Sequence, residues 1–148
     1  MKVIGIIPSR FGSSRFPGKP LAVLAGKPLV AWVVEAVKKA SSLDDVLVAT
    51  DDRRIVEAVE SYGGRAVMTP SELPSGTDRI ACAAGDFSDD DILVNIQGDE
   101  PLIDPKLIEY ATNFIMGKLD VEDDAVWEAF KADLEKMGLE RYIEVLNE

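Results

Sequence analysis

The sequence contains no histidine and a single cysteine, Cys82. The lack of histidine excludes a Ser-His-Asp triad, a Cys-His pair and a zinc site built on histidine. One cysteine cannot form an intramolecular disulfide, and no secretory signal is present, so we expect a reducing, cytoplasmic location. Cys82 lies among alanines, which predicts a buried, unreactive thiol.

Long hydrophobic runs and an excess of basic residues are also missing. No apolar run approaches the roughly 18 residues that a membrane span requires, so we expect no membrane partner. The chain has 16 Lys and Arg against 27 Asp and Glu, a formal net charge of −11. Because nucleic-acid surfaces need a basic face, this balance argues against a nucleic-acid partner. Any chemistry must use carboxylates, lysine and arginine, with or without a hard metal ion.

The chain does contain enough apolar sequence for one α/β domain, with 148 residues that are 47% hydrophobic. Four short apolar runs that are typical of strands buried on both faces alternate with helical patterns. The runs are residues 3–7, 46–49, 65–68 and 92–96, and the helical patterns are residues 29–37, 55–62 and 77–84. This alternation predicts a Rossmann-like, mostly parallel sheet with helices on both faces. With strand order 3-2-1-4, the loops after the first and fourth strands meet at the ligand-binding switch point.

The loop that follows the first strand, residues 8–21, is rich in Gly, Ser and Pro and carries Arg10, Arg15 and Lys19. Three cations on a loop with exposed backbone N–H groups favour phosphate binding. The loop matches neither the P-loop nor the dinucleotide fingerprint. The alternative is a surface loop whose cations are only solvated.

The loop that follows the fourth strand, residues 97–101, carries the carboxylates of Asp99 and Glu100. At the end of a rigid strand, Asp99 is suited to hold a Mg²⁺ ion that bridges phosphate oxygens. The alternative is a turn whose acidic residues cap a helix that begins near Pro105.

Two further polar segments precede helical patterns. Asp51 and Asp52 follow the second strand, where an N-cap is the ordinary explanation. Ser75, Gly76 and Thr77 are suited either to contact a base or sugar or to cap a short helix, and the sequence favours neither role.

Five segments resemble, in the same order, the CMP-KDO synthetases, or 3-deoxy-manno-octulosonate cytidylyltransferases, within the glycosyltransferase-A-like nucleotidyltransferases. They are Pro-Ser-Arg to Pro-Gly-Lys-Pro-Leu at 8–21, then 26–28, 48–52, 75–79 and 95–101. The resemblance implies a fold of the nucleotide-diphospho-sugar transferase type and the use of Mg²⁺. It also implies transfer of CMP from CTP to KDO, a lipopolysaccharide precursor, with release of pyrophosphate.

The same resemblance implies roles for individual residues. Lys19, Arg10 and Asp99 are the expected catalytic residues, and Asp99 is the expected metal ligand. The expected nucleotide-binding residues are Arg10, Ser13, Arg15, Lys19, Ser75, Gly76, Arg79 and Gln97. Lys19 and Arg10 would neutralise the charge that develops as the phosphate bond breaks.

The resemblance fades near residue 113, which predicts a nucleotide-binding unit at 1–113 and a helical tail at 114–148. The tail has two apolar stripes, around Phe130 and at 139–146, joined at Gly138. We expect these helices to bury their stripes on the sheet or on the flank of the α/β unit, and Trp127 to pack there.

The tail resembles the C-terminal helices of extracellular solute-binding proteins, which suggests a chimera, natural or engineered. In the CMP-KDO synthetases, the part that this chain lacks supplies a second metal-binding Asp, much of the sugar pocket and the dimer-forming strands. We therefore expect weak or absent turnover and a possible oligomer. A non-catalytic scaffold with weak nucleotide binding is the main alternative, and a solute-binding fragment is a third.

Overall fold

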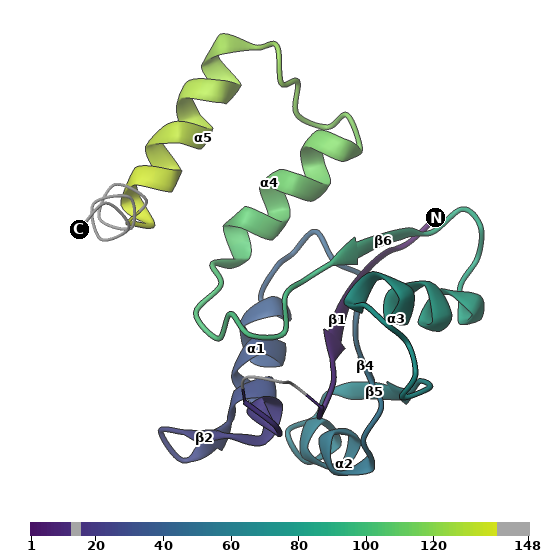
Figure 1. Ribbon diagram of the computed structural model, residues 1–148. Coiled ribbons are helices and arrows are strands. Elements are labelled where there is room, and N and C mark those ends of the chain that lie inside the picture. The colour runs from purple at the N-terminus through teal and green to yellow at the C-terminus, as the bar shows by residue number, and fades with distance from the viewer. Residues whose placement is uncertain (13–15, 139–148) are drawn as a thin grey trace.

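The computed structural model describes residues 1–12 and 16–138. Four strands form a parallel sheet in the order β5-β4-β1-β6. They are β1 (Val3–Ser9), β4 (Asp45–Thr50), β5 (Arg65–Met68) and β6 (Ile92–Asn95). This is the predicted order 3-2-1-4, and the predicted α/β fold class is confirmed (Figure 1).

Within the described residues, five α-helices, two 3-10 turns and a small hairpin complete the fold (Figure 1). The α-helices are α1 (Leu29–Val37), α2 (Arg53–Ser61), α3 (Gly76–Ala83), α4 (Pro105–Ile115) and α5 (Asp124–Lys136). The 3-10 turns are η1 (Lys19–Leu21) and η2 (Ala84–Asp86), and the hairpin joins β2 (Val23–Leu24) to β3 (Lys27–Pro28). None of the helices in the described part of the chain is long and apolar enough to cross a membrane.

The two faces of the sheet carry separate hydrophobic clusters, because successive side chains of a strand point to opposite faces. On β4, Val46 and Val48 join the cluster formed with α1 and α2, whereas Leu47 and Ala49 join the cluster formed with α3. The central strands β1 and β4 are therefore buried on both faces, as predicted.

The outer strands differ from the prediction, because every residue of β5 and β6 is half-buried or exposed. Among the described residues, β5 pairs with β4 alone and β6 pairs with β1 alone, so each has less cover than a central strand. The expectation that all four strands are buried on both faces is wrong for these two.

The prediction of a buried thiol at Cys82 is also wrong, because Cys82 is exposed. The buried residues of α3 are Arg79, Ile80 and Ala83, which lie on the face that meets the sheet. The helical period turns Cys82 away from that face.

The described tail helix, α5, packs against α4 and not against the sheet (Figure 1). The ring of Phe130 lies 4.8 Å from that of Tyr110 and 5.6 Å from that of Phe114, between ring centroids. Trp127 lies 5.3 Å from Phe130 but stays 44% exposed. Helix α4 reaches the core through Ile108, so α5 contacts the α/β unit through α4.

The predicted boundary at 113/114 falls inside α4, because this helix continues to Ile115. The second tail helix, predicted at 139–146, lies outside the described residues.

Candidate active site

Two segments that are distant from β1 in the sequence approach Pro8, near the end of β1. A β-carbon placed on Gly98, just after β6, would lie 2.8 Å from the Pro8 carbonyl oxygen. A β-carbon on Gly76, at the start of α3, would lie 3.3 Å from Pro8 Cγ. Glycine therefore allows both segments to approach the beginning of the basic loop closely.

Two hydrogen bonds of the Phe11 backbone hold the start of the basic loop in place. The Phe11 N–H donates to Asp51 Oδ1 at 2.9 Å, and the Phe11 carbonyl accepts from the Gly18 N–H at 2.8 Å. Gly18 has φ 72°, a left-handed conformation that glycine adopts without strain. Because Gly18 directly precedes Lys19, this closure fixes where the lysine leaves the loop.

The structure brings Lys19 and Asp99 together. Lys19 Nζ lies 2.9 Å from Asp99 Oδ2, and the two side chains are 40% and 53% exposed. The predicted meeting of a cation from the first loop and a carboxylate from the fourth is therefore confirmed as geometry.

Other predicted site residues lie at the same end of the sheet. Arg10 and Gln97 are exposed, and the Arg10 guanidinium has no hydrogen-bond or ion-pair partner within residues 1–12 and 16–138. Ser13 and Arg15 lie outside the described residues.

Ser75 is the N-cap of α3, and its Oγ accepts from the Asp78 N–H at 3.1 Å. The capping alternative is therefore confirmed, and contact of Ser75 and Gly76 with a nucleotide stays a prediction.

Arg79 differs from the expectation, because its side chain is 1% exposed and makes internal bonds. Its Nη2 lies 3.3 Å from Asp51 Oδ2, and its Nη1 donates to Thr69 Oγ1 and to the Pro70 carbonyl. A buried guanidinium needs such partners because desolvation of a charge is costly. This geometry does not support a direct contact between Arg79 and a nucleotide.

The two adjacent aspartates have different roles. Asp52 caps α2, and its Oδ1 accepts from the Arg54 N–H at 2.9 Å, so the capping explanation is confirmed for this residue. The side-chain hydrogen bond from Arg54 lowers the pKa of Asp52, against a smaller opposing effect of desolvation. Asp51 caps nothing and instead joins Phe11 to Arg79. Its position at the end of β4, where ligands bind in such sheets, was the signal available in the sequence.

Asp99 and Glu100 do not cap α4, because Asp104 does so through the Lys106 N–H at 2.9 Å. The capping alternative for the two carboxylates is therefore wrong.

The donor set favours a metal bound together with phosphate over a metal bound alone. No group of three or more Cys, Asp or Glu side chains suited to a metal occurs among the described residues. Mg²⁺ is commonly held by one or two carboxylates and by substrate phosphates. Asp99 fits that arrangement, with oxygen ligands and a neighbouring lysine for the phosphates.

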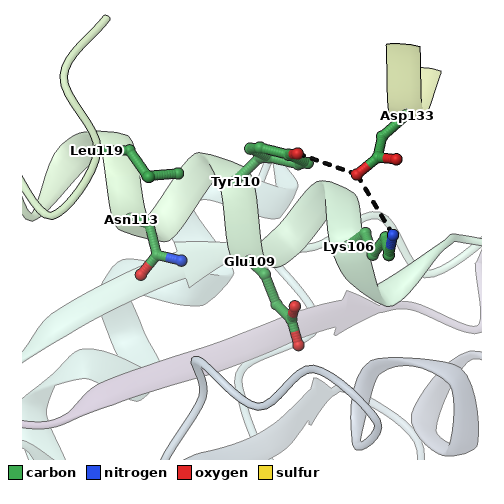
Figure 2. A pocket seen from close by; sticks show the side chains of 6 residues that line it. All are labelled: Lys106, Glu109, Tyr110, Asn113, Leu119 and Asp133. Atoms are coloured by element: carbon green, nitrogen blue, oxygen red, sulfur yellow. Dashed lines mark hydrogen bonds and ion pairs between the residues drawn. The ribbon is translucent and has the colours of Figure 1, made fainter. Parts of the chain in front are cut away.

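A separate pocket of about 140 Å³ lies between α4 and α5 (Figure 2). It is lined by Lys106, Glu109, Tyr110, Asn113, Leu119 and Asp133. Figure 2 shows Tyr110 and Lys106 reaching Asp133. The Tyr110 hydroxyl donates to Asp133 Oδ2 at 3.0 Å, and Lys106 Nζ lies 3.3 Å from the same oxygen. No residue of the Lys19–Asp99 site lines this pocket.

The parallel sheet and the loops that meet beyond its carboxyl ends define a Rossmann-like nucleotide-binding domain of the nucleotidyltransferase type. The profile of the cytidylyltransferase family matches residues 4–118. The chain belongs to this family.

Two relatives cover the same part of the chain. The 3-deoxy-manno-octulosonate cytidylyltransferase of Leptospira interrogans is 54% identical over 108 residues, which are 73% of this chain and 44% of the relative. The 8-amino-3,8-dideoxy-manno-octulosonate cytidylyltransferase of Shewanella frigidimarina is 57% identical over 111 residues, which are 74% of this chain and 45% of the relative. The chain thus spans somewhat less than half the length of these relatives.

Two solved structures are also similar to this chain. CMP:2-keto-3-deoxy-manno-octonic acid synthetase complexed with CTP superposes with a TM-score of 0.72 at 42% identity, over 79% of this chain and 47% of that one. A manganese complex of a Mycobacterium tuberculosis protein gives a TM-score of 0.56 at 15% identity, over 77% of this chain and 59% of that one, and shows the shared fold. The chain is therefore a cytidylyltransferase domain related to CMP-KDO synthetase.

Proposed function

We propose that this domain binds CTP with Mg²⁺ and serves the transfer of CMP to KDO, with release of pyrophosphate. The observation that carries the proposal is the Lys19–Asp99 ion pair, in which a cation suited to phosphate lies beside a carboxylate suited to a metal ion. The 42% identical structure that contains CTP supports the choice of nucleotide. We further propose that the reaction takes place in the cytoplasm.

In this reaction a hydroxyl oxygen of the sugar forms a bond to the α-phosphorus of CTP, in line with the leaving group. The bond from the α-phosphorus to the bridging oxygen breaks, pyrophosphate leaves with the bond electrons, and the hydroxyl proton passes to solvent. No covalent enzyme intermediate is needed, so the domain acts by positioning and by electrostatic stabilisation.

The roles of the residues follow from their places. When CTP binds, the Lys19–Asp99 ion pair opens and Lys19 binds phosphate oxygens instead. Arg10, which has no partner among the described residues, adds a second cation. Ser75, Gly76 and Gln97 would contact the base or sugar. For Ser13 and Arg15, which lie outside the described residues, phosphate contacts are proposed from the resemblance of the basic loop alone. Asp99 would hold the metal ion, which would neutralise charge at the phosphates.

The acceptor belongs to the class of eight-carbon acidic sugars. KDO and its 8-amino analogue are named for relatives of 54% and 57% identity, so identity does not separate them. We propose KDO because the resemblance of the sequence motifs is to the KDO enzymes.

Calorimetry of CTP binding with and without Mg²⁺, together with a pyrophosphate-release assay, tests the proposal. We expect Mg²⁺-dependent CTP binding and slow release with KDO, both lost in Lys19→Ala and Asp99→Ala. Lys131→Ala is the matched control, because Lys131 is an exposed, ion-paired lysine on α5. Lack of CTP binding by the unmodified chain would overturn the proposal.

The second candidate is a binding module without turnover. It is favoured by the lack of any group of three or more metal-binding side chains among the described residues. CTP binding without any pyrophosphate release above background, with KDO or with its 8-amino analogue, would establish this candidate.

A further inference from the structure

The carboxylate of Asp51 joins two segments that neighbour the candidate site. Its Oδ1 accepts from the Phe11 N–H at 2.9 Å, and its Oδ2 lies 3.3 Å from Arg79 Nη2. The Asp51 side chain is 11% exposed and that of Arg79 is 1% exposed, so water competes little for these bonds.

On the loop side, both backbone polar groups of Phe11 are used. The N–H donates to Asp51, and the carbonyl accepts from Gly18, the residue before Lys19. The Arg54 guanidinium lies over the Phe11 ring, with its Cζ 3.9 Å from the ring centroid. The backbone of Phe11 therefore links the start of the basic loop to Asp51 and to Gly18, near the end of the loop.

On the other side, Arg79 fixes the orientation of Asp51. The guanidinium is held by Thr69 Oγ1 and the Pro70 carbonyl as well as by Asp51. Thr69 in turn donates from its N–H and its hydroxyl to the Thr50 carbonyl, at 2.7 and 3.0 Å. The carboxylate is thus oriented by buried groups from β4, the loop after β5 and α3.

We propose that Asp51 is a positioning residue for the phosphate-binding loop. Asp51 touches no substrate in this proposal, which rests on the proposed CTP binding, and acts by holding Phe11 and hence Gly18 and Lys19. Arg79 serves the nucleotide site indirectly, by orienting Asp51 and joining α3 to the loop.

The first test compares the affinities for CTP and CMP, with Mg²⁺, of the full 148-residue chain and its variants. In Asp51→Ala we expect about tenfold weaker CTP binding, the effect of losing one hydrogen bond to a charged group. CMP binding should weaken much less, since the loop holds the phosphates that CMP lacks. Asp51→Asn leaves one acceptor oxygen for two donors, so it should show the same pattern with a smaller change. This variant replaces Asp51→Ala in the test if Asp51→Ala does not fold.

The matched control is Asp45→Ala. Asp45 lies at the opposite end of β4 and pairs with Arg65 of β5, so it also ties β4 to a neighbouring segment by an ion pair. A merely structural effect would lower the melting temperature in both variants and leave the CTP to CMP affinity ratio unchanged. An unchanged ratio in folded Asp51→Asn and Asp51→Ala would overturn the proposal.

The second test does not need a nucleotide. Hydrogen exchange of the Phe11 and Gly18 amides, followed by NMR, should be faster in Asp51→Ala and unchanged in Asp45→Ala. If the unmodified chain binds no CTP, the proposed function fails, while the exchange rates still show whether Asp51 holds the loop. Equal exchange rates in all variants would overturn the positioning role itself.

Discussion

The ammonium of Lys19 lies 2.9 Å from the carboxylate of Asp99, so a cation of the β1 loop neutralises an anion of the β6 loop. Both side chains are well exposed, and an exposed ion pair of this kind contributes little to stability. The pair is therefore easily opened by a ligand that offers phosphate to the lysine and a metal ion to the aspartate.

The pair predicts opposite effects of one substitution on two ligands. Lys19→Met should weaken binding of CTP with Mg²⁺ by about tenfold or more, because a charged hydrogen bond is lost. The same variant should bind Mn²⁺ alone more tightly, because Asp99 no longer has a competing cation. Mn²⁺ binding followed by electron paramagnetic resonance checks this, and a parallel loss of both affinities would contradict it.

The close approach at Gly98 predicts a loss of stability on the smallest possible substitution. In Gly98→Ala the new methyl group meets the Pro8 carbonyl oxygen, a backbone atom 2.8 Å away. We expect a decrease of about 1–3 kcal/mol in the free energy of unfolding, measured by urea denaturation. Gly85→Ala is the control, because nothing lies within 4 Å of its new methyl group. Equal effects of the two substitutions would show that the Pro8 contact is not tight.

The aromatic contact between α4 and α5 predicts that a substitution of Phe130 detaches α5 and leaves the α/β core folded. Phe130→Ala removes the ring that contacts Tyr110, Phe114 and Trp127. We expect the docking of α5 to weaken by about 1–3 kcal/mol, since the ring is only half-buried. Hydrogen exchange should become faster in α5 and stay unchanged in β1 and β4.

This result bears on the predicted division of the chain. The family match ends at residue 118, between α4 and α5, and the division of the chain at 113/114 stays a prediction. Joint unfolding of α5 and the sheet in Phe130→Ala would argue for a single cooperative unit. The chimera stays a hypothesis.

The α4–α5 contact should also depend on pH. A hydrogen bond from Lys136, with further bonds from Tyr110 and Lys106, lowers the pKa of Asp133 below its ordinary value of 3.8. A carboxyl whose pKa is lower in the folded state stabilises above its unfolded pKa, and the stabilisation disappears as the pH falls. We therefore expect α5 to loosen below about pH 4, seen as a change in Trp127 fluorescence. Asp133→Asn should lack this transition, and a transition that persists in the variant would assign it to another group.

Much of the fold was predictable because it depends on local periodicity. The apolar run of β4 and the helical spacing of α1 and α2 are visible in the sequence, and the order 3-2-1-4 is that of the doubly wound sheets. The half-exposure of β5 and β6 was missed, because an apolar run does not show whether it has a neighbour on each side.

The candidate site, like the fold, was predictable from the sequence only in part. By itself, the sequence determined which residue types are available: the cations of the β1 loop, the carboxylate after β6, and the exclusion of histidine chemistry. Only the tertiary structure decided their use. It paired Lys19 with Asp99, buried Arg79 and turned Asp51 toward Phe11, because these contacts join segments whose separation in space is set by the packing of the sheet.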